Sequence, residues 1–293
     1  MPADKIRVVQ FLHPGREHQP GKDGFQNWNP LTKSHRRKFL QHLGQHLENI
    51  AGKPASDDLH FWAEWEPQSE RIRAIDAGRE GFPRNIVRPF LVPQRNYSGL
   101  HSTDPFVFGD VFYYSHCMMS ASLASMARGS IILFGSHKGG AFLLDTVFVV
   151  ADWIECSSKD CKSVPDVFRK ATLEPLYANH ADKNGDSSCP PGSRLYRGAM
   201  HNGRFNGMFS FFPCRPADES EGFARPAVCD SRFINPRQMR GVGITDCSIE
   251  DAAELWRSIA KQVLETRVDG KPLRLGVSAK LPPFGNSKAD GSH

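Results

Sequence analysis

The first 66 residues gather the side chains with the clearest capacity for chemistry. Half of the twelve histidines of the chain lie there, together with several carboxylates, arginines and tryptophans. The tightest cluster is His13-Pro-Gly-Arg-Glu-His18, in which Glu17 adjoins the second histidine. Such residues could bind a metal, or could provide a general base and the group that orients it. The spacing differs from the His-Glu-x-x-His of helical zinc sites and includes a Pro-Gly turn, so it does not predict a zinc protease.

Glu64 and Glu66 share one face of a strand predicted over residues 59–66. Because side chains alternate along a strand, Trp62 lies on the face of the two glutamates and Trp65 on the other. The two carboxylates could act as acid and base together with nearby histidines. The candidate catalytic residues are therefore Glu64, Glu66, His13 and His18. A solvent-exposed face on which the glutamates form ion pairs with arginines is the alternative.

Three polar segments could converge on one pocket at the edge of the core sheet: a loop over residues 13–30, the basic segment 35–38, and the strand face at 60–66. The candidate ligand-binding residues are polar and aromatic side chains of these segments and two carboxylates of the apolar core, namely Glu17, Trp28, Asn29, His35, Arg36, Arg37, Trp62, Trp65, Asp104 and Asp145. Asp145 interrupts the apolar run LLDTVFVV, where a carboxylate must be paired or hydrogen-bonded. The seven cysteines lack the Cys-x2-Cys spacing of structural zinc, so neither a metal site nor a cofactor is predicted.

Three segments outside the core stretch have helical patterns. Ser34 can cap a helix over residues 35–49, whose buried face would contain Phe39, Leu40, Leu43 and Leu47. The capping box Ser248-Ile-Glu-Asp251 predicts a helix that continues to about residue 266. A shorter helix is expected over residues 165–171.

Residues 104–153 contain the densest apolar segments of the chain, and we expect the core sheet there. Strands are predicted over 107–114, 131–134 and 141–150, with a short helix over 120–127 and a glycine-rich hairpin turn over 135–140. The predicted fold class is α+β, with a strongly bent or barrel-like mixed β-sheet and flanking helices. Residues 1–277 would form a single composite domain, with a surface excursion over 156–193 and a disordered tail over 278–293.

Composition indicates an ordinary globular chain with a mildly basic surface. It contains 37 Lys and Arg against 32 Asp and Glu, a formal net charge of +5. This excess favours an anionic partner such as nucleic acid or a nucleotide, although a surface charge that serves only solubility explains it as well. No window approaches the roughly 20 apolar residues that span a bilayer, and the first residues lack the apolar run of a secretory signal. We therefore expect a cytoplasmic protein without membrane association; the sequence does not predict its oligomeric state.

The order of a small helix, the strand ARGSIILF and the strand FLLDTVFVV, within residues 104–153, resembles the PUA-like superfamily, which includes ASCH and EVE domains. The resemblance implies a barrel-like sheet and the binding of RNA or modified bases. It also implies an association with DNA or RNA modification and phage-defence systems. An aromatic pocket containing Trp62 and Trp65 could hold an extruded base, while Glu64 and Glu66 read its edge.

Three functions remain open at this point. The first is recognition of nucleic acid or a modified nucleotide in an aromatic and carboxylate pocket. The second is an enzyme that acts on a nucleotide or nucleic acid by Glu/His acid–base catalysis. The third is a protein-interaction subunit without a small-molecule site. The sequence does not decide whether the protein is an enzyme.

Overall fold

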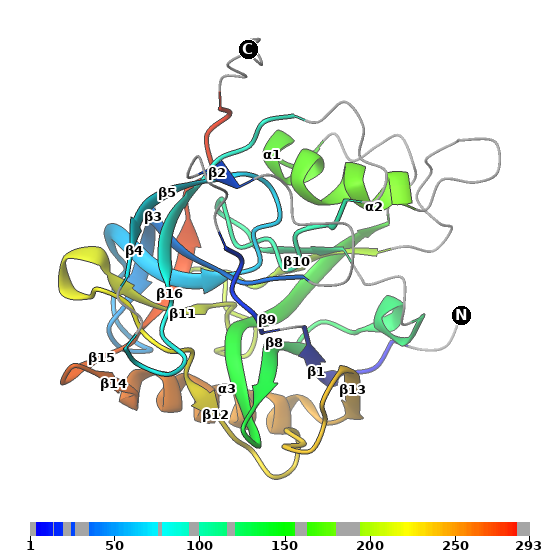
Figure 1. Cartoon of the computed structure of the whole chain (residues 1–293). Coiled ribbons are helices and arrows are strands. Elements are labelled where there is room, and N and C mark those ends of the chain that lie inside the picture. Colours follow the sequence, from blue (N-terminus) through cyan, green and yellow to red (C-terminus); the bar gives the residue numbers. More distant parts are fainter. Residues whose placement is uncertain are drawn as a thin grey trace.

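Two seven-stranded β-sheets dominate the structure, and they pack against each other with few helices around them (Figure 1). The computed structural model describes residues 4–13, 15–19, 25–26, 35–75, 78–93, 100–115, 121–155, 163–179 and 194–285. The expected barrel-like α+β fold is confirmed in this form, although strands contribute far more residues than helices.

The first sheet is mixed, because β1 pairs in parallel with β8 and antiparallel with β13. β12 pairs with Phe142 and Leu143 at the start of β9. The strands in spatial order are β13 (Gly241–Asp246), β1 (Arg7–Leu12), β8 (Ile131–Lys138), β9 (Ala141–Glu155), β10 (Arg194–Gly198) and β7 (Tyr113–Ser115), with β12 (Ala227–Val228) attached to β9.

The second sheet closes into a four-stranded antiparallel barrel, because β16 pairs with both β11 and β3. β6 adds to β3 in parallel, and β5 and β2 extend this side. The strands in spatial order are β16 (Arg274–Ala279), β11 (Phe212–Pro216), β4 (Ala55–Ala63), β3 (Lys38–Leu47), β6 (Asn85–Pro89), β5 (Ser69–Ala74) and β2 (Phe25–Gln26). A separate small hairpin consists of β14 (Arg267–Val268) and β15 (Lys271–Pro272).

The hairpin of β8 and β9 confirms the strands expected at 131–134 and 141–150. Its turn is shorter than expected, because pairing continues to Lys138 and Ala141. Gly139 and Gly140 occupy the tip with φ angles of 60° and 79°, a region that glycine adopts without steric cost. The β-branched and aromatic residues at 131–134 and 142–150 are buried, as expected for the centre of a sheet covered on both faces.

The helix predicted over residues 35–49 is wrong, because this segment forms strand β3. Its apolar residues fit a 3.6-residue period, but Leu43, which the helix would bury, is 47% exposed. Pairing with β4 along nine positions and with β16 on the other side outweighs the local helical pattern. Gly44 allows the barrel to close, since a Cβ atom there would lie 2.5 Å from the backbone oxygen of Ser278.

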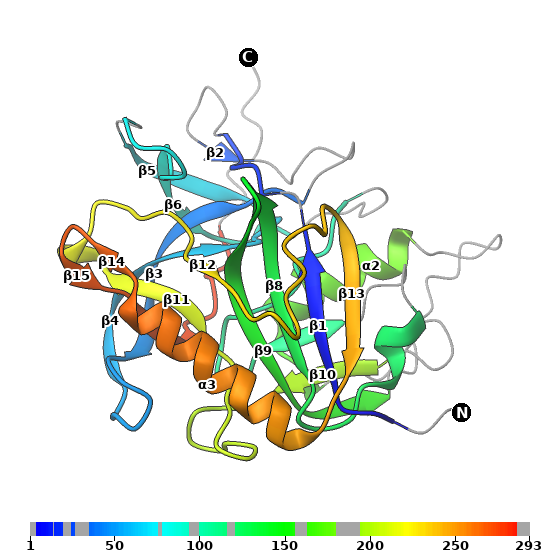
Figure 2. The ribbon, with the colours of Figure 1, turned by 90° about the horizontal axis from the view of Figure 1, so that it is seen from below.

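The capping-box helix is confirmed as α3 (Ile249–Glu265). The Ser248 hydroxyl accepts a hydrogen bond from the Asp251 backbone N–H at 3.0 Å. In the view from below, α3 runs across the front of the strands (Figure 2), and it contacts β12, β15 and β16. Trp256 anchors the helix, since its indole N–H donates to the Phe209 carbonyl at 2.7 Å. A polar helix with one apolar stripe thereby covers the lower end of both sheets.

Residues 163–179 form a second helical region, longer than the helix expected at 165–171. It comprises α1 (Asp166–Phe168), the π-helical turn η3 (Arg169–Leu173) and α2 (Glu174–Asn179). Val164, Phe168 and Leu173 belong to the main apolar core, so this part of the chain is not a surface excursion. The flanking residues 156–162 and 180–193 lie outside the described part.

Two short 3-10 helices complete the described structure. η1 (Ala121–Ser125) lies within the segment where a short helix was predicted, and η4 (Ala217–Glu219) follows β11.

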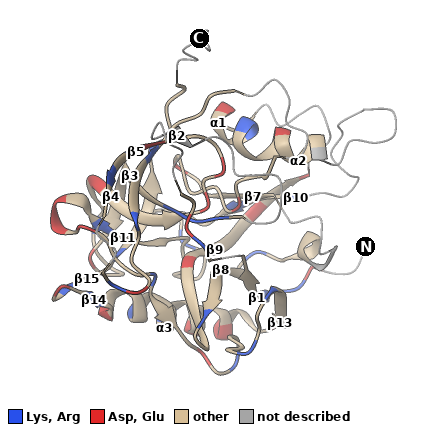
Figure 3. Ribbon diagram, in the orientation of Figure 1, with Lys and Arg blue, Asp and Glu red and all other residues tan. Residues whose placement is uncertain are grey.

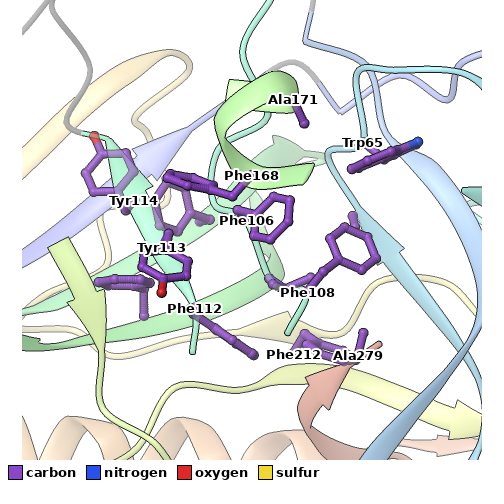
Figure 4. Close-up of a cluster of buried hydrophobic side chains, with 14 of the residues drawn as sticks. Trp65, Phe106, Phe108, Phe112, Tyr113, Tyr114, Phe168, Ala171, Phe212 and Ala279 are labelled. Atoms are coloured by element: carbon purple, nitrogen blue, oxygen red, sulfur yellow. The ribbon is translucent and has the colours of Figure 1, made fainter. Parts of the chain in front are cut away.

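Aromatic side chains fill the space between the barrel and the region 163–179. Figure 4 shows Trp65, Phe106, Phe108 and Phe168 in this cluster, and Phe108 lies edge-on to Trp65 with ring centroids 5.1 Å apart. A second core lies between α3 and the sheets.

The disordered tail predicted over residues 278–293 needs correction at its start, because β16 continues to Ala279 and Phe284 pairs with Leu91. Among the described residues, no helix has the length and apolarity to cross a membrane.

Candidate functional site: a buried His, Glu, Arg and Asp network

The antiparallel register of β3 and β4 explains why four polar side chains meet. Lys38 pairs with Ala63 in this register. Extending it past the end of β4 sets Arg37 opposite Glu64 and His35 opposite Glu66. Because all four follow the alternation that also places Trp62, they share one face, as the sequence predicted for the two glutamates.

Glu64 is the centre of the network. Its Oε2 atom lies 2.5 Å from Nδ1 of His13 and accepts a hydrogen bond from Arg37 Nη1 at 2.5 Å. Its Oε1 atom lies 2.9 Å from Nδ1 of His35, and the same nitrogen lies 3.5 Å from Oε1 of Glu66. The rings of His13 and His35 are stacked, with centroids 4.8 Å apart. Two histidines and two carboxylates from three strand ends therefore form one contiguous group.

Arg37 connects this group to the first sheet. Its Nε atom donates to Oδ2 of Asp145 on β9 at 2.6 Å. Arg225 approaches the other oxygen of Asp145 at 3.4 Å and donates to the Gly15 carbonyl at 2.8 Å. Asp145 is thus paired, as expected of a carboxylate within an apolar strand.

Burial and charge change the proton affinities of the network in opposite directions. Burial alone would raise the pKa of Glu64, but its interactions with His13, His35 and Arg37 hold it well below its usual value. Burial opposes protonation of His35, yet Glu64 and Glu66 raise its pKa to about 11. The pKa of His13 is lowered, because burial outweighs the attraction of Glu64. Glu64 is therefore ionised at neutral pH, His35 is protonated and His13 is neutral.

Two further ionisable groups flank the network. Burial, and to a lesser extent the charge of Glu64, raises the pKa of Asp104 well above its usual value, and Ser115 donates its hydroxyl to this carboxyl group. Burial lowers the pKa of Lys38 to about 7, while Glu66 acts against this shift. The ammonium group of Lys38 donates to the Pro67 carbonyl at 2.5 Å. At neutral pH, Lys38 is therefore only partly charged.

A pocket of about 900 Å³ lies on the far side of Arg225. Its lining includes Trp62 and Arg225, which adjoins the network, and Ser136 and Lys138 of the β8–β9 hairpin. Arg16 and Arg84 also contribute cationic side chains, and Glu17 and Glu80 contribute carboxylates. The Ser136 hydroxyl is buried and has no hydrogen-bond partner within the described part of the protein. Over the whole ribbon, by contrast, basic and acidic positions are interspersed (Figure 3).

The structure brings together six of the sequence-predicted residues: His13, His35, Arg37, Glu64, Glu66 and Asp145. Asp104 lies near enough to Glu64 for the charge of that carboxylate to raise its pKa. Glu17 instead accepts hydrogen bonds from the backbone N–H groups of Arg84 and Asn85 and reaches only the pocket lining.

The remaining candidates lie elsewhere. His18 is buried, and its backbone N–H pairs with the Arg37 carbonyl. Trp65 is fully buried in the aromatic core and donates its indole N–H to the Gln68 carbonyl, a position unsuited to stacking on a base. Trp62 lines the pocket with a small exposed area, and Arg36 is half-buried. Trp28 and Asn29 lie outside the described residues.

Sequence reasoning missed Arg225, His101 and Ser136, and it included Lys38 only within the basic segment 35–38. The His101 ring lies 4.7 Å from that of His35, although 66 residues separate the two in the chain. Arg225 belongs to a loop with no recognisable pattern. Only Lys38 carried a signal, because it continues the basic run that contains Arg36 and Arg37.

Fold and site together define a mixed β protein with a buried ionic network beside a partly open basic pocket. Comparisons of the chain with family models, with curated proteins and with solved structures find no match in any of the three. The functional argument therefore depends on the chemistry of the site.

Proposed function

We propose that this protein binds a nucleotide, either free or within a nucleic-acid strand, in the pocket beside Arg225. The observation that carries the proposal is a pocket of about 900 Å³ with four cationic side chains, Arg16, Arg84, Lys138 and Arg225, in its lining. This volume falls within the range of small-molecule sites, and arginine groups suit phosphate oxygens.

The pocket also offers a boundary for the base. Phe82 and Trp62 contribute aromatic surface to its lining. Trp62 is held in place, since its indole N–H donates to the Phe223 carbonyl at 2.8 Å and the Arg225 guanidinium lies 5.5 Å from its ring centroid. We assign Trp62 the role of orienting Arg225 and closing the pocket floor, with Phe82 as the more accessible aromatic group.

The PUA-like relationship is a further part of the proposal. The closed barrel and the β8–β9 hairpin support it, because both suit a bent sheet that presents a pocket at its edge. On this view the ligand is a modified base, and the protein acts in the cytoplasm as part of a nucleic-acid modification or phage-defence system.

Catalysis is a second candidate function, and the contact of His13 with Glu64 favours it. A neutral imidazole held by a carboxylate is a common arrangement for a general base. Arg225 links the network to the pocket through Asp145, so a ligand there would bind next to the ionic chain. The protein would then hydrolyse or transfer a group of the bound nucleotide rather than only recognise it.

Calorimetric titration of the full chain with ADP and with a 5′-phosphorylated single-stranded oligonucleotide tests the binding proposal. We expect saturable binding that weakens between about 50 and 200 mM salt and falls at least about tenfold in R84A and R16A. The matched control is R257A, which removes one positive charge from the exposed face of α3. Absence of binding, or equal losses in R257A and R84A, would contradict the proposal. Turnover of the bound ligand that H13Q abolishes, with affinity unchanged, would favour the enzyme.

A further inference from the structure

The atoms of His35, Glu64 and Glu66 are arranged as three ligands around one point. The imidazole Nδ1 and one oxygen of each carboxylate all lie within 4.8 Å of one another. Two of these separations are 2.9 Å, from His35 to Glu64, and 3.5 Å, from His35 to Glu66. Metal bonds of about 2.1 Å at angles of about 90–110° place neighbouring ligand atoms about 3.0–3.4 Å apart. The two separations from His35 are therefore close to those in a coordination polyhedron.

Hydrogen bonding at Glu64 supports the same interpretation. Its Oε2 atom is occupied by His13 and Arg37, which fix the orientation of the carboxylate. Its Oε1 atom is buried and faces Nδ1 of His35 at 2.9 Å, but among the described residues neither atom makes a hydrogen bond of good geometry. Buried polar atoms normally have a partner, and a carboxylate that binds a metal with one oxygen commonly accepts hydrogen bonds with the other.

We propose that His35, Glu64 and Glu66 bind a divalent first-row transition metal ion, with Mn²⁺ as the suitable probe. One imidazole and two carboxylates suit such an ion, and three protein ligands leave coordination positions for water or for an oxygen of a ligand. The side chain of His35 is 33% exposed, whereas those of Glu64 and Glu66 are buried, so the ion reaches the site from the His35 side. Sequence spacing gives no sign of this site, because its ligands come from two different strand ends.

The charges around the point are compatible with a cation. Against the three carboxylates Glu64, Glu66 and Asp145 stand two guanidinium groups: Arg37 pairs with Glu64 and Asp145, and Arg225 pairs with Asp145. Binding of the ion releases the proton that His35 carries at neutral pH, so that the imidazole ligand is neutral. Asp145 pairs with both arginines, which directs part of their charge away from the ligand oxygens. The proposal goes beyond nucleotide binding, and it is measurable without any nucleotide.

The test uses the full chain, freed of metal by a chelator, in calorimetric and electron paramagnetic resonance titrations with Mn²⁺. We expect one ion per chain and an affinity at least about tenfold lower in H35Q and in E66Q. H46Q is the matched control, because His46 forms an isolated pair with one carboxylate, Asp57, at 2.8 Å. Undiminished binding by H35Q and E66Q, or no stoichiometric binding by the unmodified chain, would overturn the proposal.

A measurement on the unmodified protein guards against variants that fail to fold. Electron spin echo modulation of bound Mn²⁺ should show coupling to the nitrogen of one imidazole, and its absence would also overturn the site. These experiments test the metal site and the nucleotide site independently, so one proposal can be refuted while the other stands. A chain that binds Mn²⁺ but no nucleotide keeps the metal site and loses the proposed function, and the opposite result keeps the function alone.

Discussion

Arg37 and Asp145 join the two sheets of this protein through a buried ion pair with an Nε to Oδ2 distance of 2.6 Å. Arg37 directly precedes β3 of the barrel, whereas Asp145 lies on β9 of the other sheet. The same guanidinium also holds Glu64. One side chain thus fixes the relative position of the carboxylates on which the proposed functions depend.

We expect R37M to lower the free energy of unfolding by about 3–5 kcal/mol, because it removes the buried guanidinium that Glu64 and Asp145 share. Urea denaturation measures this loss. R257A, which removes an exposed arginine of α3, should change stability by less than about 0.5 kcal/mol. A loss below about 1 kcal/mol in R37M would show that the ion pair contributes little to joining the sheets.

Gly44 should not tolerate a side chain, because a Cβ atom would lie 2.5 Å from the Ser278 carbonyl oxygen and 2.8 Å from a methyl group of Leu59. We expect G44A to cost about 1–3 kcal/mol, as overpacking does in a well-packed core. In G203A the new methyl group would meet nothing within 4 Å, so this variant is the control. Equal stability of the two variants in thermal unfolding would argue against the barrel closure between β3 and β16.

The lowered pKa of His60 leads us to expect a loss of stability in acid. Burial lowers the pKa of this histidine to about 4 in the folded protein, whereas an unfolded chain has the ordinary value of 6.5. The unfolded state therefore binds more protons as the pH falls from about 6.5 to 4, and stability decreases across this range. H60Q should decline less than the unmodified chain, by up to about 3 kcal/mol at the acid end. Parallel pH profiles of the two proteins, measured by urea denaturation, would contradict this assignment.

The raised pKa of Asp104 leads us to expect a dependence of stability on pH with the opposite sign. Burial raises the pKa of this carboxyl group in the folded protein, so folding favours its protonated form. The stabilisation is complete below the ordinary pKa of about 3.8 and is lost as the pH rises through the folded value. D104N should therefore gain stability relative to the unmodified protein as the pH rises above about 3.8. S115A, which removes the hydroxyl that donates to Asp104, is the comparison; a constant difference between D104N and the unmodified chain at all pH values would refute the shift.

Local interactions determined the elements that the sequence predicted well. The helix α3 depends on a cap between Ser248 and Asp251, three residues apart, and on an apolar stripe that repeats within the same segment. The β8–β9 hairpin depends on adjacent strands and a glycine turn. The shared face of Trp62, Glu64 and Glu66 follows from strand alternation alone. Each of these relationships is contained in a few consecutive residues, which is why the sequence by itself determined them.

Only the tertiary structure decided that residues 38–47 form a strand and that the network exists. The local pattern of that segment fits a helix, but pairing with β4 and β16 adds hydrogen bonds and burial that no short segment can supply. His13, Arg37, Asp145 and Arg225 come from four distant parts of the chain. Their convergence depends on the closure of the barrel and on the packing of one sheet against the other. Residue types can name such candidates, but long-range packing selects which of them share a site.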